Sequence, residues 1–144
     1  TESDVPKLLS MAGRFVGESS LPLTFNREVS YRMFMHTIES PHSILLLEDD
    51  GGVVTGGIMG VVAQDFCNEL CAYVTKMYVE REFRGLGTAR SLIDAFEVEA
   101  RSLGASVVFA AATAGMGDRV EKLYVRLFER CGYEILGRVL TRRI

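Results

Sequence analysis

The sequence lacks tryptophan entirely and contains only three prolines, three cysteines and two histidines. So few histidines and cysteines leave little material for a metal centre, and an odd number of cysteines does not suit a disulfide framework. Lysine and arginine total 16 against 19 for aspartate and glutamate, so no strong basic charge favours nucleic acid as a general partner. No apolar run approaches the roughly 18 residues of a membrane span, and the N-terminus does not resemble a signal peptide. These absences predict a soluble, cytoplasmic protein that binds no metal.

The scarce cysteines and histidines have structural explanations. Cys67, Cys71 and Cys131 stand in apolar surroundings, which is typical of reduced, buried thiols. His36 and His42 flank the end of an expected helix, and neither has a carboxylate or thiol at the spacing of a metal-binding pair. We therefore interpret the histidines as surface or capping residues.

What the chain does contain is enough apolar material, 48% of 144 residues, for one domain over residues 1–144 with a continuous core. The apolar pattern alternates between helical spacing and short strand-like runs. It predicts helices over residues 4–17, 26–40, 88–103 and 120–131, and strands over residues 44–47, 53–63, 70–79, 107–112, 133–136 and 138–142. A meander of strands followed by a strand-helix-strand crossover predicts an α/β fold, a mixed sheet with helices on both faces.

The most informative segment joins the predicted strand 70–79 to the helix that follows. It reads Arg84-Gly85-Leu86-Gly87-Thr88-Ala89, a glycine turn into a helix N-terminus, where backbone N–H groups point outward and favour a phosphate. It is not a Walker loop, because the sequence has no Gly-Lys followed by serine or threonine. A dinucleotide fingerprint would need a third glycine where Arg90 stands.

This loop resembles the pyrophosphate loop of the GNAT superfamily of acyl-CoA-dependent N-acyltransferases, Arg/Gln-x-x-Gly-x-Gly/Ala. Met77-Tyr78-Val79 resembles the apolar-x-Val step before that loop, and Cys131-Gly132-Tyr133-Glu134 resembles the family's terminal Gly-aromatic step. The order of helices and strands agrees over nearly the whole chain. The resemblance implies the GNAT fold, a mixed, mostly antiparallel twisted sheet whose central strand pair is splayed.

The resemblance also implies a cosubstrate, acetyl-CoA or a close acyl-CoA, and an amine acceptor. The pyrophosphate of the acyl-CoA would bind the backbone amides of Arg84, Gly85, Leu86, Gly87, Thr88 and Ala89. The strand backbone at Met77, Tyr78 and Val79 would receive the pantetheine and the acyl group, with an N–H group stabilising the oxyanion. Transfer to the amine would be direct, since no cysteine stands in a recognisable nucleophile setting.

The catalytic side chains are less well defined by the resemblance. Glu69, just before the central strand, is the candidate general base, with a solvated loop carboxylate as the alternative. Many family members place a proton-donating tyrosine where this chain has Phe128, so Tyr124, one helical turn earlier, becomes the candidate acid, with a core aromatic as the alternative. Glu80 and Glu82, beside the phosphate loop, are expected to be exposed charges.

The acceptor side and the chain ends complete the expectations. The candidate wall residues of the acceptor opening are Tyr31, Phe34, Phe66 and Tyr73, each with core packing as the alternative. Arg138, Arg142 and Arg143 make the C-terminal segment basic, most simply for the solubility of an edge strand. Because the family starts with a strand before the first helix, we expect that a segment upstream of Thr1 was trimmed.

Three functions remain open at this point. The first is an N-acetyltransferase that moves the acetyl group of acetyl-CoA to an unidentified amine. The second is a GNAT-fold module that binds coenzyme A without turnover, suggested by Phe128. The third is a nucleic-acid-modifying relative, supported only by the terminal arginines. The acceptor is undefined, and so is the oligomeric state, a homodimer being one option.

Overall fold

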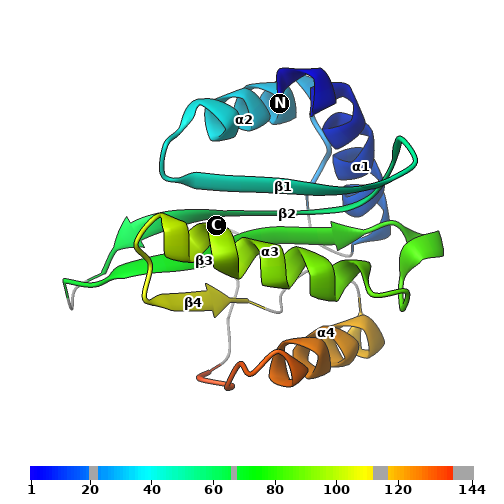
Figure 1. Cartoon of the computed structure of the whole chain (residues 1–144). Helices are drawn as coiled ribbons and strands as arrows, with labels where there is room; N and C mark the ends of the chain where they lie inside the picture. The colour runs from blue at the N-terminus through cyan, green and yellow to red at the C-terminus, as the bar shows by residue number, and fades with distance from the viewer. Residues whose placement is uncertain (20–22, 66–67, 112–116, 138–144) are drawn as a thin grey trace.

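The strands of the central sheet follow one another in space in the order of the sequence. A computed structural model of the chain describes residues 1–19, 23–65, 68–111 and 117–137 (Figure 1). Its elements are η1 (Glu2–Asp4), α1 (Val5–Glu18), α2 (Arg27–Glu39), β1 (Ser43–Asp50), β2 (Val53–Gln64), β3 (Leu70–Val79), η2 (Arg81–Phe83), α3 (Thr88–Ser102), β4 (Val107–Ala110) and α4 (Asp118–Arg130). The sheet order is β1-β2-β3-β4, and all neighbouring strands are antiparallel except the parallel pair β3–β4. This confirms the predicted mixed sheet.

Local sequence signals explain most element boundaries. Asn26 caps α2, since its side-chain oxygen accepts a hydrogen bond from the Val29 amide at 3.0 Å. Asp4 precedes α1 without capping it, because its carboxylate is bonded to Thr1 instead. β1 extends to Asp50, beyond its predicted end at residue 47, so the hairpin turn is confined to two glycines.

One predicted strand is wrong. Residues 133–137 have no regular secondary structure, and within the described residues they pair with no strand. Ile135 and Leu136 are largely exposed, so their alternation does not bury an apolar face. A strand exists only through a partner, and the partner predicted over residues 138–142 lies outside the described residues.

The helices cover both faces of the sheet and build two apolar clusters (Figure 1). α1 and α2 pack on one face around Leu8, Phe34 and Tyr78. α3 and α4 pack on the other face, where Phe96 is completely buried and Phe128 nearly so. Side chains alternate across a strand, so Met77 and Val79 belong to the α3–α4 face, while Tyr78 between them belongs to the α1–α2 face.

β2 admits α3 at short range because it carries glycine at the point of closest approach. A Cβ on Gly60 would lie 2.3 Å from the carbonyl oxygen of Tyr73 and 2.7 Å from the ring of Phe96. The register between β2 and β3 shifts at the same level, between Met59 and Gly60. The sheet is therefore bulged beside Phe96, just before β3 loses β4 as a neighbour.

Candidate active site

The central strand β3 has a free edge near its C-terminal end. Its pairing with β4 covers only Cys71 to Val74, whereas its pairing with β2 continues to Val79 opposite Gly56. Within the described residues, the second half of β3 therefore has a neighbour on one edge alone. This is the splayed central pair that the resemblance implied.

The hydrogen bonds around Val79 show which groups face the free edge. The Glu80 amide donates to the Thr55 carbonyl of β2 at 2.9 Å, so the backbone N–H group of Glu80 points toward β2. Backbone groups alternate between the two edges of a strand, which turns the N–H and C=O groups of Val79 and Met77 to the free edge. The Val79 carbonyl indeed lies there, since it accepts a hydrogen bond from Arg84 Nε at 3.0 Å.

The loop that follows β3 presents several unfilled amides at the same end of the sheet. Gly85 and Gly87 have φ angles of 88° and 101°, a left-handed conformation that favours glycine, and among the described residues no further atom lies within 4 Å of a Cβ built on either. Within the described residues, the amides of Gly85, Gly87, Thr88 and Ala89 have no hydrogen-bond acceptor. The first turn of α3 contains no acidic residue, so nothing there competes with an anion. The loop thus has the geometry of a phosphate site.

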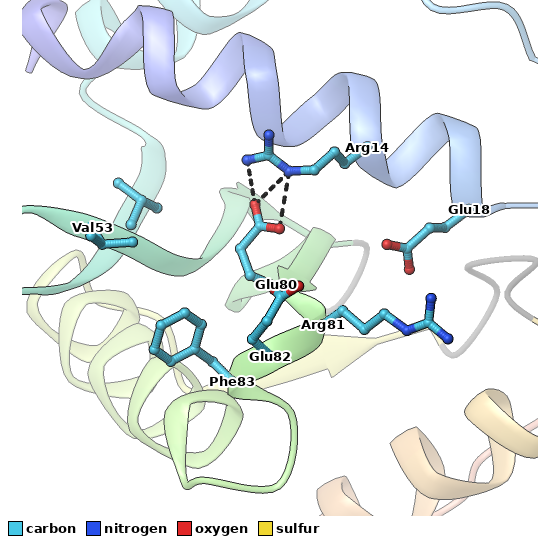
Figure 2. Close-up of a pocket in the computed structure, with 8 residues that line it drawn as sticks. Arg14, Glu18, Val53, Glu80, Arg81, Glu82 and Phe83 are labelled. Atoms are coloured by element: carbon cyan, nitrogen blue, oxygen red, sulfur yellow. Dashed lines mark hydrogen bonds and ion pairs between the residues drawn. The ribbon is translucent and has the colours of Figure 1, made fainter.

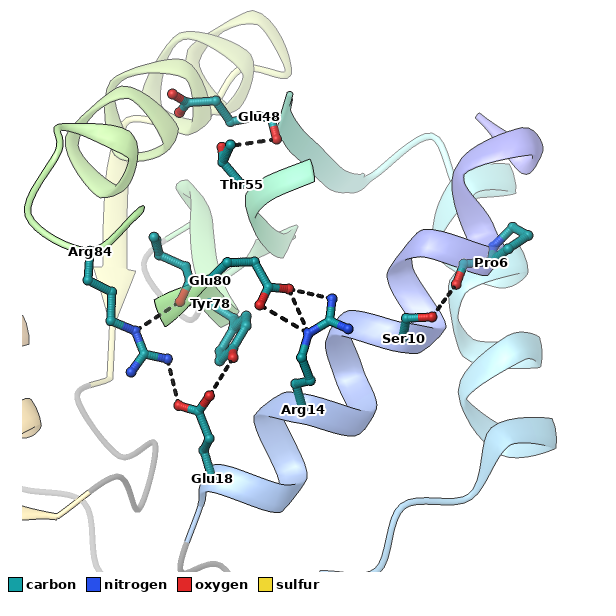
Figure 3. Close-up of polar contacts among 10 residues, drawn as sticks. Pro6, Ser10, Arg14, Glu18, Glu48, Thr55, Tyr78, Glu80 and Arg84 are labelled. Atoms are coloured by element: carbon teal, nitrogen blue, oxygen red, sulfur yellow. Dashed lines mark hydrogen bonds and ion pairs between the residues drawn. The ribbon is translucent and has the colours of Figure 1, made fainter. Parts of the chain in front are cut away.

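Arg84 begins this loop, and its guanidinium group, although partly exposed, is held by three neighbouring groups. Its Nε group binds the Val79 carbonyl, its Nη2 group donates to Glu18 Oε2 at 2.6 Å, and its guanidinium lies 5.4 Å from the Tyr78 ring centre. Tyr78 donates its hydroxyl to Glu18 Oε1 at 2.8 Å (Figure 3). Burial and this bond raise the pKa of Tyr78 to about 12. Burial alone would raise the pKa of Glu18, but the bonds from Arg84 and Tyr78 lower it.

A second ion pair joins α1 to the same turn. Arg14 donates from Nε to both carboxylate oxygens of Glu80 at 3.0 Å and from Nη2 to Oε1 at 2.6 Å (Figure 2). The expectation that Glu80 is exposed is wrong: the residue is 8% exposed, because α1 covers it. Glu82 is exposed, as expected. The pKa of Arg14 is raised by the bond to Glu80.

A cavity of about 390 Å³ lies between α1, the start of β2 and η2 (Figure 2). Its lining comprises Arg14, Glu18, Val53, Val54, Glu80, Arg81, Glu82 and Phe83. Since Val53 and Val54 belong to β2, the cavity is on the paired side of β3, across the strand from the free edge. We therefore do not assign it to the thioester.

Tyr124 lies on α4, against the cluster on the α3–α4 face. Its ring centre is 4.7 Å from that of Phe128, which in turn meets Tyr133 edge to face at 4.8 Å. Phe128 is 6% exposed and serves as a core residue. Burial raises the pKa of Tyr124, and within the described residues no hydrogen bond engages its hydroxyl. The raised pKa keeps this phenol protonated at neutral pH, and its role as the acid stays a prediction.

Glu69 lies at the opposite end of β3 from the phosphate loop. It directly precedes Leu70, is exposed, and accepts a hydrogen bond from the Ser106 hydroxyl at 3.1 Å. At about 3.3 Å per residue, it lies roughly 25 Å along the strand from Met77. Its role as a base stays a prediction, and at this distance it would require a chain of water molecules.

The expected acceptor-side residues do not gather at one place. Phe34 is buried between α1 and α2, and Tyr31 is about half exposed. Tyr73 stacks on Phe109 of β4 and donates its hydroxyl to Asp65 at 3.2 Å. Phe66 lies outside the described residues, as do Cys67 and the terminal arginines Arg138, Arg142 and Arg143.

Two further observations concern the described residues. No helix among them is long and apolar enough to cross a membrane. Nor do they hold a group of three or more histidine, cysteine, aspartate or glutamate residues close enough to hold a metal ion.

Known structures share this fold at low sequence identity. The aminoglycoside N-acetyltransferase AAC(6')-Iy, solved with a bisubstrate analogue that contains coenzyme A, aligns over 99% of this chain and 92% of its own, with 14% identity and a TM-score of 0.79. An aminoglycoside acetyltransferase from an uncultured soil metagenomic sample, solved with sisomicin, aligns over 100% and 91%, with 16% identity and a TM-score of 0.74. A ribosomal-protein-alanine N-acetyltransferase from Brucella melitensis biovar Abortus 2308 aligns over 100% and 96%, with 15% identity and a TM-score of 0.73.

The family assignment comes from the sequence itself. No curated protein sequence matches the chain significantly. The sequence profile described as the acetyltransferase (GNAT) family matches residues 15–133, which include the last turn of α1, the free edge of β3, the phosphate loop and α4. The chain belongs to the acetyltransferase (GNAT) family and is an acyltransferase.

Proposed function

We propose that this protein transfers an acetyl group from acetyl-CoA directly to the amine of an acceptor. The observation that carries the proposal is the free edge of β3 next to the unfilled amides of the phosphate loop. The pyrophosphate of an acyl-CoA can bind the loop, while its pantetheine and thioester bind the free edge of the strand. The neighbours solved with coenzyme A or with aminoglycosides support both substrate classes, but at 14–16% identity they do not define this acceptor.

The pyrophosphate binds the backbone of residues 84–89, where the α3 dipole adds to the hydrogen bonds. Glycine at positions 85 and 87 keeps side chains away from the phosphate oxygens. The pantetheine extends along the free edge of β3, beside Met77 and Val79. An N–H group of that edge hydrogen-bonds the thioester oxygen and stabilises the negative charge that develops on it.

The chemical step is the attack of an unprotonated amine on the thioester carbon. The N–C bond forms as the π electrons of the carbonyl move to its oxygen, and collapse of this tetrahedral intermediate breaks the C–S bond, whose electron pair leaves on sulfur. Tyr124 donates its proton to the thiolate and recovers one from solvent. The amine proton leaves to water, or to Glu69 through water.

Acceptor-dependent release of free thiol from acetyl-CoA tests the proposal. The purified protein is offered an aminoglycoside such as sisomicin, a polyamine, free amino acids and a peptide with a free N-terminus, and thiol is followed with a colorimetric reagent. We expect saturable thiol release with at least one amine and an acetylated product of matching mass. Tight coenzyme A binding with no thiol release from any amine would favour the non-catalytic module instead.

A further inference from the structure

Glu18 connects the end of α1 to both parts of the candidate active site. Its two carboxylate oxygens each have a partner: Oε2 receives Arg84 Nη2 at 2.6 Å, and Oε1 receives the Tyr78 hydroxyl at 2.8 Å (Figure 3). Arg84 is the first residue of the phosphate loop, and Tyr78 lies in β3. One side chain therefore fixes the loop and the strand relative to each other.

The connection reaches the backbone of the free edge itself. Arg84 binds Glu18 with one end of its guanidinium group and the Val79 carbonyl with Nε, so Glu18 is one guanidinium group away from that edge. The planar fork of arginine orients both bonds at once. A change at Glu18 is thus transmitted to Val79 without an intervening flexible segment.

We propose that Glu18 is a positioning residue for acyl transfer: through Arg84, it sets the orientation of the Val79 backbone that receives the thioester. This inference rests on the proposed function. Glu18 is also the last residue of α1, so the segment that leads to α2 begins where the acyl-CoA site is fixed. Glu18 does not act as the general base, because a carboxylate bonded to a guanidinium and a phenol is a poor proton acceptor.

The pair Arg14–Glu80 provides an internal comparison. Arg14 lies one helical turn before Glu18 on α1, and Glu80 follows Val79 directly, so both pairs dock the same helix on the same turn. The Glu80 N–H group, which shares a peptide unit with the Val79 carbonyl, is held by the Thr55 carbonyl of β2, and this backbone hydrogen bond does not depend on Arg14. A purely structural role of α1 docking would make the two pairs equivalent.

The test compares E18Q with two controls. E82Q makes the same change of charge on an exposed carboxylate of η2, the turn that follows β3. R14Q removes the ion pair between Arg14 and Glu80. We expect E18Q to lower kcat about tenfold, as a misplaced reacting group does. Its Kd for coenzyme A should change less than threefold, because the pyrophosphate binds backbone amides. E82Q and R14Q should keep a kcat within twofold of wild type at temperatures where both are folded.

A second measurement needs no acceptor. Hydrogen exchange of the wild type with acetyl-CoA, which carries the thioester, should show protection of the amides of Gly85, Gly87, Thr88, Ala89 and Val79. In E18Q, the protection of the loop amides should persist and that of Val79 should fall. A wild-type protein that binds coenzyme A but acetylates no amine would contradict the proposed function, and this measurement would still decide the role of Glu18. Equal kcat or equal Val79 protection in E18Q and wild type, or an equal loss in R14Q, would overturn the inference.

Discussion

Replacement of Gly87 by alanine separates backbone strain from phosphate binding, because the chain contains a matched glycine elsewhere. Gly87 has a φ of 101°, and Gly52, in the turn between β1 and β2, has a φ of 91°. In the part of the chain that the structure describes, no neighbouring atom lies within 4 Å of a Cβ built at either position. A left-handed conformation costs a residue with a side chain about 1–2 kcal/mol. G87A and G52A should therefore lose similar free energies of unfolding, measured in urea.

The two variants should differ in coenzyme A binding. At Gly87 the new methyl group crowds the phosphate and removes the contact of one amide with it, and a hydrogen bond to a charged group is worth about 1.5–3 kcal/mol. G87A should thus bind coenzyme A roughly 10- to 150-fold more weakly in titration calorimetry, while G52A binds like wild type. Wild-type affinity in G87A would refute the phosphate site. An equal loss in both variants would assign the effect to strain.

Three further predictions follow from the core and the tyrosines. Y124F should lower kcat by about 10²-fold or more without a change in the Kd of coenzyme A, measured in single turnover; an unchanged kcat would exclude Tyr124 as the acid. G60A forces its Cβ into the ring of Phe96 and should cost about 1–3 kcal/mol of unfolding free energy in urea. The pKa of Tyr78, about 12 in the folded protein against about 10 unfolded, means that its contribution to stability is full below pH 10 and is lost as pH rises toward 12. The melting temperature of Y78F, which cannot donate to Glu18, should depend less on pH between pH 10 and pH 12 than that of the wild type. An equal pH dependence in the two proteins would contradict this.

Features that depend on local backbone chemistry were predictable from the sequence. β3 begins and ends where its apolar run does, at Leu70 and Val79. Asn26 caps α2, and the glycines of the phosphate loop adopt the positive φ angles that a turn into a helix requires. Each of these signals lies within a few residues of the feature that it specifies, so the chain itself carries the information.

Features that depend on contacts between distant segments were not predictable. Glu80 has the composition and neighbours of an exposed loop residue, yet Arg14, 66 positions earlier, buries it. Residues 133–136 have a strand-like pattern but no partner strand among the described residues. Burial and pairing are tertiary properties, and a pattern along one segment does not say what lies against it.

The same distinction explains why the sequence predicts a phosphate loop more readily than a catalytic carboxylate. A loop that binds phosphate with backbone amides needs only a conformation, and glycines specify it locally. A carboxylate must be delivered by the fold. Glu69 adjoins β3 in the sequence but lies at its far end, whereas Glu18 lies 66 positions from Arg84 and contacts it directly. If the E18Q and E82Q variants differ as expected, the acidic residue that matters for acyl transfer is the one that chain position alone would have passed over.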